Sequence, residues 1–145
     1  MVHKVRAVAF IAGAATLAVL NVAGPASANS APQREDVCFT GACGSATVTF
    51  ESKYTAEVGM SVEDNDCDGH PARIRVIAYQ YNDTTYDYYT TNGPWHVNNS
   101  GCHGGYEAWN GLTFAGGDPL LGFEVEVQDE GVNQLYSPEM YNPYW

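Results

Sequence analysis

Apolar side chains recur at every second position over long stretches of this chain, and this spacing restricts the fold more than any other feature. The two clearest runs are Ala56, Val58, Met60 and Val62, and Leu121, Phe123, Val125 and Val127. A period of two residues places alternate side chains on opposite faces of a β-strand. After residue 28, no stretch shows the period of an amphipathic helix. The sequence therefore predicts strands and turns.

The segment from Asp64 to Tyr81 joins an acidic turn, a cysteine and a strand, and we expect it at the centre of the fold. Asp68-Gly69 is a strong turn signal, and Pro71 disfavours a helix after it. Over residues 72–81, one face is small and apolar, while the other starts basic and ends aromatic. With the other alternating segments, this predicts an all-β fold, an antiparallel β-sandwich or small open barrel of about six or seven strands.

The first 28 residues have the parts of a secretory signal peptide. A basic start precedes an apolar run from Ala7 to Gly24, and Ala26-x-Ala28 fits a cleavage site. We expect cleavage after Ala28, then a flexible segment over residues 29–37 and a single disulfide-linked β domain over residues 38–145. The protein is therefore expected to be secreted and extracellular. An uncleaved membrane anchor is the alternative, because the apolar run is long.

The chain after residue 28 is strongly acidic. Lys4 and Arg6 belong to the signal peptide, so 6 − 2 = 4 basic residues face all 17 acidic residues, a net charge of 4 − 17 = −13. Such a surface repels nucleic acids and anionic membranes. We therefore expect a monomer whose partner is an extracellular glycan or protein, with no cofactor except the calcium considered below.

The four cysteines all lie in this acidic part, and an even count in an exported chain indicates two disulfides. Of three possible pairings, we favour Cys38–Cys43, which closes a tight loop, and Cys67–Cys102, which closes a long one. Zinc is the rival use of cysteine, but the chain has no Cys-x-x-Cys pair and the export route is oxidising.

The turn before the central strand carries Asp64, Asp66 and Asp68 at alternate positions, followed by Gly69. This matches the first half of a calcium-binding loop. The full loop would need a carboxylate at position 75, which is arginine, so an EF-hand is rejected. A solvated acidic turn is the preferred interpretation, and a looser calcium site at these three aspartates is the alternative.

Features that indicate catalysis are weak. Glu124 and Glu126 lie two apart on one strand face, so they could approach the separation used in glycoside hydrolysis. Glutamates on the outward face of an edge or half-exposed strand are more often solvated. The histidines His70, His96 and His103 have no metal-ligand spacing, and disulfides leave no free thiolate. We expect no enzyme activity.

Aromatic residues are the most informative group. All ten tyrosines and three tryptophans follow residue 28, and Trp109 and Phe123 are expected in the core. The candidate ligand-binding residues are Tyr79, Tyr81, Tyr86, Tyr88 and Trp95. Their flat apolar faces and polar tips suit stacking on sugar rings or filling a partner's pocket. The alternative is cross-strand aromatic pairing, with Arg73 or Arg75 stacked on a ring.

Three short motifs carry a resemblance. They are Asp66-Cys-Asp-Gly-His-Pro-Ala-Arg-Ile-Arg-Val76, Ser100-Gly-Cys102 and Asn142-Pro-Tyr-Trp145. The chain resembles a loose group of small secreted, disulfide-containing actinobacterial proteins of unknown function, which implies no activity and no functional residues. That group often has a further cysteine where this chain has Val125 and Val127. The Trp-Arg-Tyr triplet of small secreted amylase inhibitors is absent here.

The sequence thus favours a secreted binding protein without catalytic activity, whose ligand is a glycan or a protein held by tyrosines and Trp95. The first alternative is an inhibitor of an extracellular hydrolase, which would use a rigid loop, either Phe39–Ala42 or Trp95–His103. The second is a small secreted hydrolase that uses Glu124 and Glu126.

Overall fold

A computed structural model describes residues 29–130 and 133–145, so the signal peptide predicted over residues 1–28 lies outside the described residues. The strands are β1 (Gln33–Cys38), β2 (Ala42–Phe50), β3 (Thr55–Asp64), β4 (Ala72–Asn82), β5 (Asp87–Asn92), β6 (His96–Val97), β7 (Tyr106–Ala115), β8 (Leu120–Asp129), β9 (Asn133–Tyr136) and β10 (Met140–Tyr141). No helix that could span a membrane occurs in either described range.

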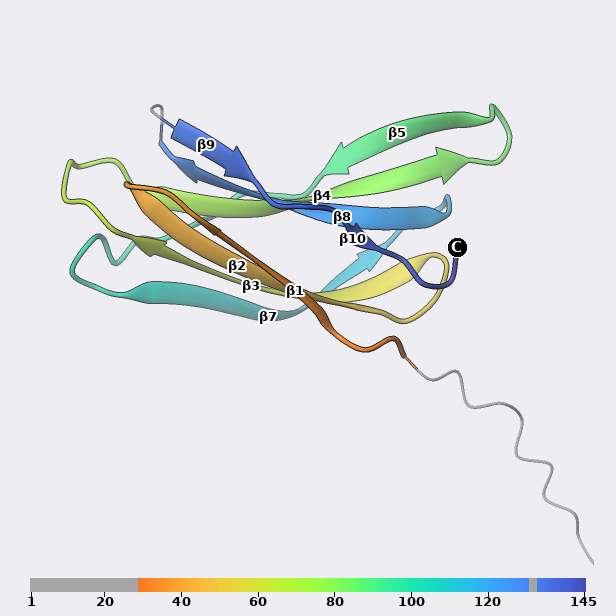
Figure 1. The fold of residues 1–145 in the computed structure, drawn as a ribbon, viewed down its shortest axis with the longest axis horizontal. Helices are drawn as coiled ribbons and strands as arrows, with labels where there is room; N and C mark the ends of the chain where they lie inside the picture. Colours follow the sequence, from red (N-terminus) through yellow and green to blue (C-terminus); the bar gives the residue numbers. More distant parts are fainter. Residues whose placement is uncertain (1–28, 131–132) are drawn as a thin grey trace, which may run out of the picture.

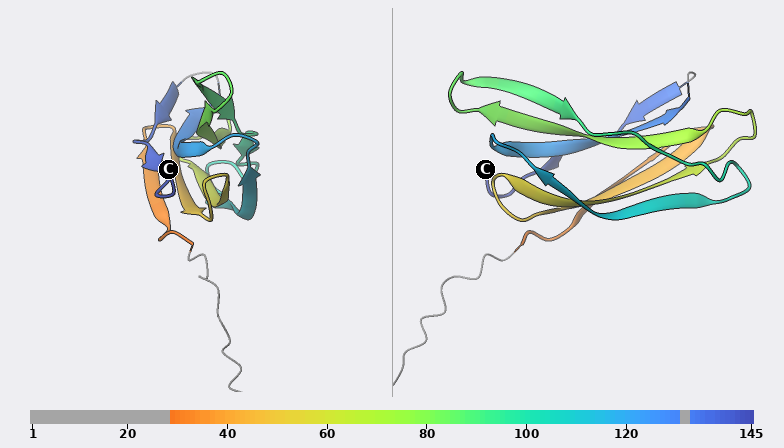
Figure 2. Two further views of the ribbon diagram at one scale, coloured as in Figure 1. Left: turned by 90° about the vertical axis from the view of Figure 1, so that its right-hand side faces the viewer. Right: turned by 180° about the vertical axis from the view of Figure 1, so that it is seen from behind.

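The strands form two antiparallel sheets that face each other (Figure 1). Sheet A has the order β1-β2-β3-β7, and sheet B has the order β10-β8-β4-β5, with β6 paired to β4 and β9 paired to β8. Figure 2 shows the same two layers from behind and from one end. The predicted all-β antiparallel sandwich is therefore confirmed, with β4 as an interior strand. The described residues contain ten strands, more than the six or seven predicted, because β1 and β9 were not expected as strands and β6 and β10 have only two residues each.

The core lies between the sheets and follows the two-residue period. Inward side chains of β2, β3, β4 and β8 are almost fully buried. The Phe123 ring packs 5.9 Å from the Phe50 ring and 5.2 Å from the Phe114 ring, measured between centroids. Phe123 is buried as predicted, but Trp109 is only half-buried. Trp109 stands on the edge strand β7, where it packs against the margin of the core and its ring lies 4.8 Å from the His96 ring, measured between centroids.

The N-terminal segment differs from the prediction. Residues 29–37 were expected to be flexible, but β1 pairs with β2 along its whole length. Val37 is buried in the core, and the Gln33 side-chain amide donates a hydrogen bond of 2.8 Å to the carbonyl of Tyr141. β1 is ordered by its backbone pairing with β2 in a hairpin, and its polar side chains gave no sign of that pairing.

Both predicted disulfides are present. Cys38–Cys43 joins cross-strand neighbours at the end of the β1–β2 hairpin, with a Cα–Cα distance of 4.1 Å. Cys67–Cys102 joins the β3–β4 loop to the loop after β6, with a Cα–Cα distance of 5.4 Å. Each bond therefore ties together segments at the end of the sandwich opposite the β4–β5 turn (Figure 1).

Candidate functional site

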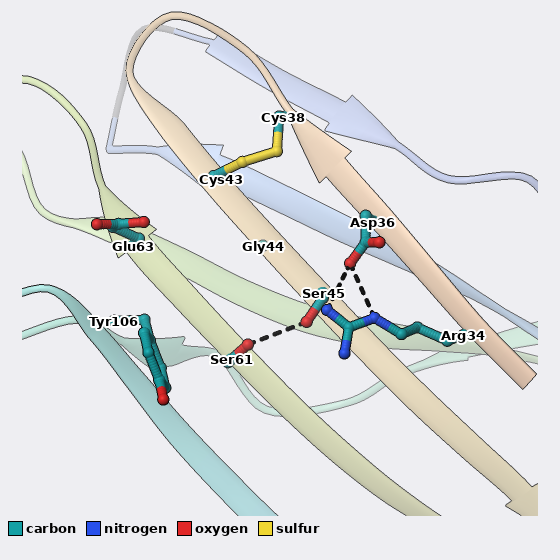
Figure 3. A pocket seen from close by; sticks show the side chains of 9 residues that line it. All are labelled: Arg34, Asp36, Cys38, Cys43, Gly44, Ser45, Ser61, Glu63 and Tyr106. Carbon is teal, nitrogen blue, oxygen red and sulfur yellow. Dashed lines mark hydrogen bonds and ion pairs between the residues drawn. A yellow bond between two sulfur atoms is a disulfide. The ribbon is translucent and has the colours of Figure 1, made fainter. Parts of the chain in front are cut away.

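The outer face of sheet A carries a shallow polar groove, here called the sheet A groove (Figure 3). Its largest hollow encloses about 570 Å³ and is lined by Arg34, Asp36, Cys38, Cys43, Gly44, Ser45, Ser61, Glu63 and Tyr106. A second hollow of about 150 Å³ shares Ser45, Ser61 and Tyr106 with the first. A third of about 170 Å³ shares Thr47 and Gly59 with the second. The three hollows therefore form one groove.

The strand register explains why this face is hollow. In one row across the sheet, Asp36 faces Ser45, Ser45 faces Ser61, and Ser61 faces Ala108. In this row the interior strands β2 and β3 thus present small side chains, whereas Glu63 and Glu57 of β3 line the hollows on either side of it. The edge strands β1 and β7 carry longer ones, including Arg34 and Tyr106. Edge side chains therefore form the walls of the groove, and serine, threonine and glycine form its floor.

The chemistry of the groove is polar, with one aromatic wall. The Arg34 guanidinium pairs with Asp36 at 2.9 Å, and both side chains are more than 60 % exposed. The hydroxyl oxygens of Ser45 and Ser61 are 3.0 Å apart. The Tyr106 side chain is 70 % exposed, on the opposite side of the two serines from the Arg34–Asp36 pair (Figure 3). The groove therefore offers donors, acceptors and a flat ring within a few strands' width.

The sequence predictions missed most of this groove. Arg34 and Asp36 fall in the segment that was expected to be flexible. Ser45 and Ser61 lie on strands that were predicted from the apolar residues of their inward faces. A usable signal was present, because Ser45, Thr47 and Thr49 repeat small hydroxyl side chains along the outer face of β2.

The structure separates the five predicted ligand-binding aromatic residues. Tyr81 contacts Tyr88 at 5.0 Å and Trp145 at 5.5 Å between ring centroids, close to the β4–β5 turn. Tyr86 occupies that turn with a φ of 61° and is 75 % exposed. We call Tyr81, Tyr86, Tyr88 and Trp145 the aromatic end. Tyr79 and Trp95 are engaged elsewhere, so the five residues do not form one surface.

Trp95 is covered by two arginines on the outer face of sheet B. The guanidinium carbons of Arg73 and Arg75 lie 4.6 and 4.3 Å from the Trp95 ring centre. Arg73 donates to the side-chain oxygen of Gln128, its cross-strand partner on β8. The arginine stacking that the sequence suggested as an alternative is therefore present, and it engages the Trp95 indole.

Glu124 and Glu126 on β8 were expected to be solvated, and the structure shows both in hydrogen bonds to other side chains. β8 is an interior strand, and Glu126 is only 2 % exposed, so the prediction of solvated glutamates was wrong for this residue. Arg75 Nε donates to Glu126 Oε2 at 2.6 Å, and the Tyr136 hydroxyl donates to Glu126 Oε1 at 3.2 Å. Both oxygens of Glu126 thus have partners, an arrangement typical of a structural ion pair.

Glu124 binds a phenol, and this contact shifts the titration of the phenol. The Tyr79 hydroxyl donates to Glu124 Oε2 at 2.6 Å, and this bond, with burial and the Glu124 charge, raises the pKa of Tyr79 to about 12. Burial, followed by repulsion from Glu124, raises the pKa of Glu139. Glu124 therefore stabilises a neutral phenol and is held by it.

This phenol predicts a pH-dependent contribution to stability. The folded-state pKa of Tyr79 is raised from 10.0 to about 12, so the folded protein keeps a proton that the unfolded chain releases. The stabilisation is complete below pH 10 and is lost as the pH rises towards 12. We expect the free energy of unfolding of Tyr79→Phe to fall less steeply than that of the unmodified protein over this interval, measured by urea unfolding. An unchanged slope would contradict this role of the Tyr79–Glu124 bond.

The aspartates that come together at the acidic turn are not the three that the sequence indicated. Carboxylate oxygens of Asp66, Asp68 and Asp129 lie within 4.8 Å of one another, and Asp64 is outside this group. Asp64 Oδ1 instead accepts a hydrogen bond from the backbone N–H of Asp66 at 3.2 Å. Burial, followed by repulsion from Asp68, raises the pKa of Asp66, and the same two causes raise the pKa of Asp129. We call Asp66, Asp68 and Asp129 the carboxylate cluster.

Cysteine and histidine also meet near this turn. The imidazole Nε2 of His103 lies 3.6 Å from Cys67 Sγ, close to Cys102. Both sulfurs are committed to the disulfide, so neither is available as a thiolate ligand. This group is therefore a poor zinc site.

The first of the two loops that could serve an inhibitor is folded inward. The backbone N–H of Phe39 donates to the carbonyl of Ala42 at 2.9 Å, and Phe39 packs against the core. Gly41 and Ala42 are buried, which leaves Thr40 as the exposed residue of Phe39–Ala42. In the second loop, Asn98 is buried and its side-chain amide donates to the carbonyls of Val62 and Gly105. Hydrogen bonds and a disulfide restrain each loop, and neither presents a long exposed segment.

No protein-family model matches this chain, and no curated protein matches it either. Any inference about its function therefore rests on the geometry of the groove, the aromatic end and the carboxylate cluster.

Proposed function

We propose that this protein is exported and binds a neutral glycan in the sheet A groove without catalysing a reaction. One observation carries the proposal: an exposed tyrosine, Tyr106, lies across a hydroxyl-lined floor from an exposed arginine–aspartate pair. The two disulfides fit an oxidising compartment.

The chemistry of the groove matches that of a sugar ring. A pyranose has a flat face of C–H groups that packs on a phenol ring, and a rim of hydroxyls that both donate and accept hydrogen bonds. Arg34 supplies donors in a fixed fork, Asp36 supplies acceptors, and Ser45 and Ser61 supply both. Each class of sugar atom therefore has a counterpart in the groove.

The position and charge of the groove narrow the ligand class. It lies on paired strands, so little ordering is needed when a ligand binds. It is shallow and extends along β2 and β3 as three joined hollows, a shape that fits a polymer better than a compact molecule. The acidic composition disfavours anionic polysaccharides. A neutral polysaccharide is the ligand that these features favour.

Depletion from solution by insoluble neutral polysaccharides tests the proposal. We expect cellulose, chitin or starch to remove the purified protein from solution. We expect Tyr106→Ala to weaken retention by about three- to tenfold, because a stacked ring contributes about 0.5–1.5 kcal/mol. Tyr88→Ala is the matched control, since Tyr88 is equally exposed but belongs to the aromatic end.

Two outcomes would contradict this assignment. Loss of retention in Tyr88→Ala but not in Tyr106→Ala would move the ligand to the aromatic end. Failure of every polysaccharide to retain the protein would remove the glycan proposal.

A protein ligand, as in the inhibitor alternative, is favoured by a separate observation. Tyr86, Tyr88 and Trp145 are all more than half exposed at one end of the molecule, and exposed aromatic groups of this kind mark interaction surfaces. An inhibitor would form a stoichiometric complex with an extracellular hydrolase, and Trp145→Ala would weaken that complex while leaving polysaccharide retention intact.

A further inference from the structure

The carboxylate cluster joins two parts of the fold that are far apart in the sequence. Asp66 and Asp68 belong to the β3–β4 loop, while Asp129 is the last residue of β8. We propose that Asp66, Asp68 and Asp129 together bind one calcium ion. This site is separate from the sheet A groove, and none of its three aspartates lines that groove.

The spacing of the oxygens fits calcium. Calcium binds oxygen ligands at about 2.3–2.6 Å, so two ligands on opposite sides of the ion are about 4.6–5.2 Å apart. One carboxylate oxygen from each aspartate lies within 4.8 Å of the other two. A single ion can therefore contact all three carboxylates, and water or the second carboxylate oxygens can complete the six to eight ligands that calcium takes.

Independently of the oxygen spacing, two carboxylate oxygens of this cluster are buried without a hydrogen-bond partner. Asp129 is only 2 % exposed, and its Oδ1 atom is buried with no hydrogen-bond donor among the described residues. Asp66 Oδ1 is also buried without a hydrogen-bond donor among these residues. Buried carboxylate oxygens are normally hydrogen-bonded, paired with a cation or bound to a metal. A cation bound between the three carboxylates would give both aspartates a partner.

The surrounding residues do not supply that cation themselves. Within the described ranges, none of the ion pairs formed by lysine or arginine includes a member of the carboxylate cluster. Asp68 Oδ1 accepts a hydrogen bond of 2.8 Å from the backbone N–H of His70. That bond orients Asp68 within the turn. His70 acts electrostatically on Asp129 but makes no ion pair with the cluster, so side chains compensate the negative charge of the cluster only in part.

Backbone packing holds Asp129 in place. A Cβ atom on Gly41 would lie 2.5 Å from Asp129 Oδ2, so the β1–β2 turn packs directly on this carboxylate because it has no side chain there. Asp129 is also paired with Ala72 of β4 and with Asn133 of β9. One of the three ligands is thus fixed by the sheet, and the other two lie on a loop that the Cys67–Cys102 disulfide restrains.

The ligand set selects among metals. Three carboxylates are hard oxygen donors, which suit calcium and magnesium better than zinc. Magnesium requires octahedral geometry at shorter distances and gives up its water reluctantly, whereas calcium accepts an irregular shell. The sequence suggested Asp64, Asp66 and Asp68 as calcium ligands; the structure assigns Asp129 in place of Asp64, whose Oδ1 holds the turn.

Calorimetric titration of the purified protein with CaCl₂ tests the site directly. We expect one ion per chain, with a dissociation constant of about 10⁻⁴–10⁻³ M, the range of extracellular calcium modules. The same titration with MgCl₂ should give at least tenfold weaker binding. Asp129→Asn and Asp68→Asn should each weaken calcium binding at least tenfold. Asp87→Asn is the matched control and should bind calcium normally. Asp87 is an exposed aspartate on β5, paired with Asn82 at the far end of β4.

Thermal unfolding distinguishes a variant that has lost only the calcium site from one that has failed to fold. In EGTA, Asp129→Asn should be at least as stable as the unmodified protein, because the change removes an unpaired buried charge. In excess calcium, the order should reverse, since only the unmodified protein gains stability from the ion. Absence of any calcium heat and of any calcium-dependent change in Tm would overturn the proposal. Unchanged calcium affinity in Asp129→Asn would overturn the assignment of this ligand.

Discussion

Replacing Arg75 by methionine is expected to lower the free energy of unfolding by about 3–5 kcal/mol, the cost of leaving a buried charge without its partner. Glu126 is 2 % exposed, and the Arg75 guanidinium is its only cationic contact among the described residues. Methionine keeps much of the arginine stem, so loss of packing contributes little. The variant also loses the stacking of Arg75 on Trp95, a smaller effect of about 0.5–1 kcal/mol.

A double variant separates the ion pair from its surroundings. Arg75→Met with Glu126→Leu replaces the pair with apolar side chains, and such replacements of buried pairs are often neutral. We expect the double variant to recover most of the stability lost in Arg75→Met, measured by urea unfolding with unchanged slope. A loss below about 1 kcal/mol in Arg75→Met would place this pair with ordinary surface salt bridges. The burial of Glu126 would then have no energetic consequence.

Removing the Cys67–Cys102 disulfide is expected to cost about 4 kcal/mol, and removing Cys38–Cys43 about 2 kcal/mol. The difference follows from the lengths of the closed loops, since the paired cysteines are separated by 35 and 5 residues. A longer cross-link removes more conformations from the unfolded chain. Serine at each pair of positions keeps side chains of similar size.

The two disulfide variants should be compared by urea unfolding in EGTA. Cys67 lies between Asp66 and Asp68, so loss of this disulfide also loosens the proposed calcium site, and EGTA removes that contribution. Equal losses from both pairs would contradict the loop-length argument. A larger loss from Cys38–Cys43 would show that native packing around the β1–β2 turn outweighs chain entropy.

The periodic strands were predictable because their signal is local. Val58, Met60 and Val62 alternate with polar residues on β3, and Phe123, Val125 and Val127 do so on β8, and both strands occur where the sequence indicated. The cysteine pairing was also within reach, since the Cys38–Cys43 spacing suits a hairpin and leaves one further pair. β1 was missed because a short polar strand has no period of its own, and its pairing with β2 supplies its order.

Some residues of the candidate sites could be predicted from their spacing in the sequence, and others are brought together only by strand pairing. Asp66 and Asp68 stand out by their spacing along the chain, but Asp129 joins them only through the pairing of β8 with β4. The groove is likewise a product of register, which places Ser45 beside Ser61 and raises Arg34 and Tyr106 on either side. No spacing along the sequence reports that arrangement.

By itself, then, the sequence determined that this chain forms antiparallel strands, that its cysteines pair, and that one turn is acidic. These features depend on residue period, on redox chemistry and on neighbouring side chains. The tertiary structure alone decided that Glu126 is a buried partner of Arg75, that Trp95 is stacked under two arginines, and that the predicted aromatic set is divided. The physical reason is that strand order and register bring together side chains from distant segments, and these contacts depend on how the whole sheet pairs.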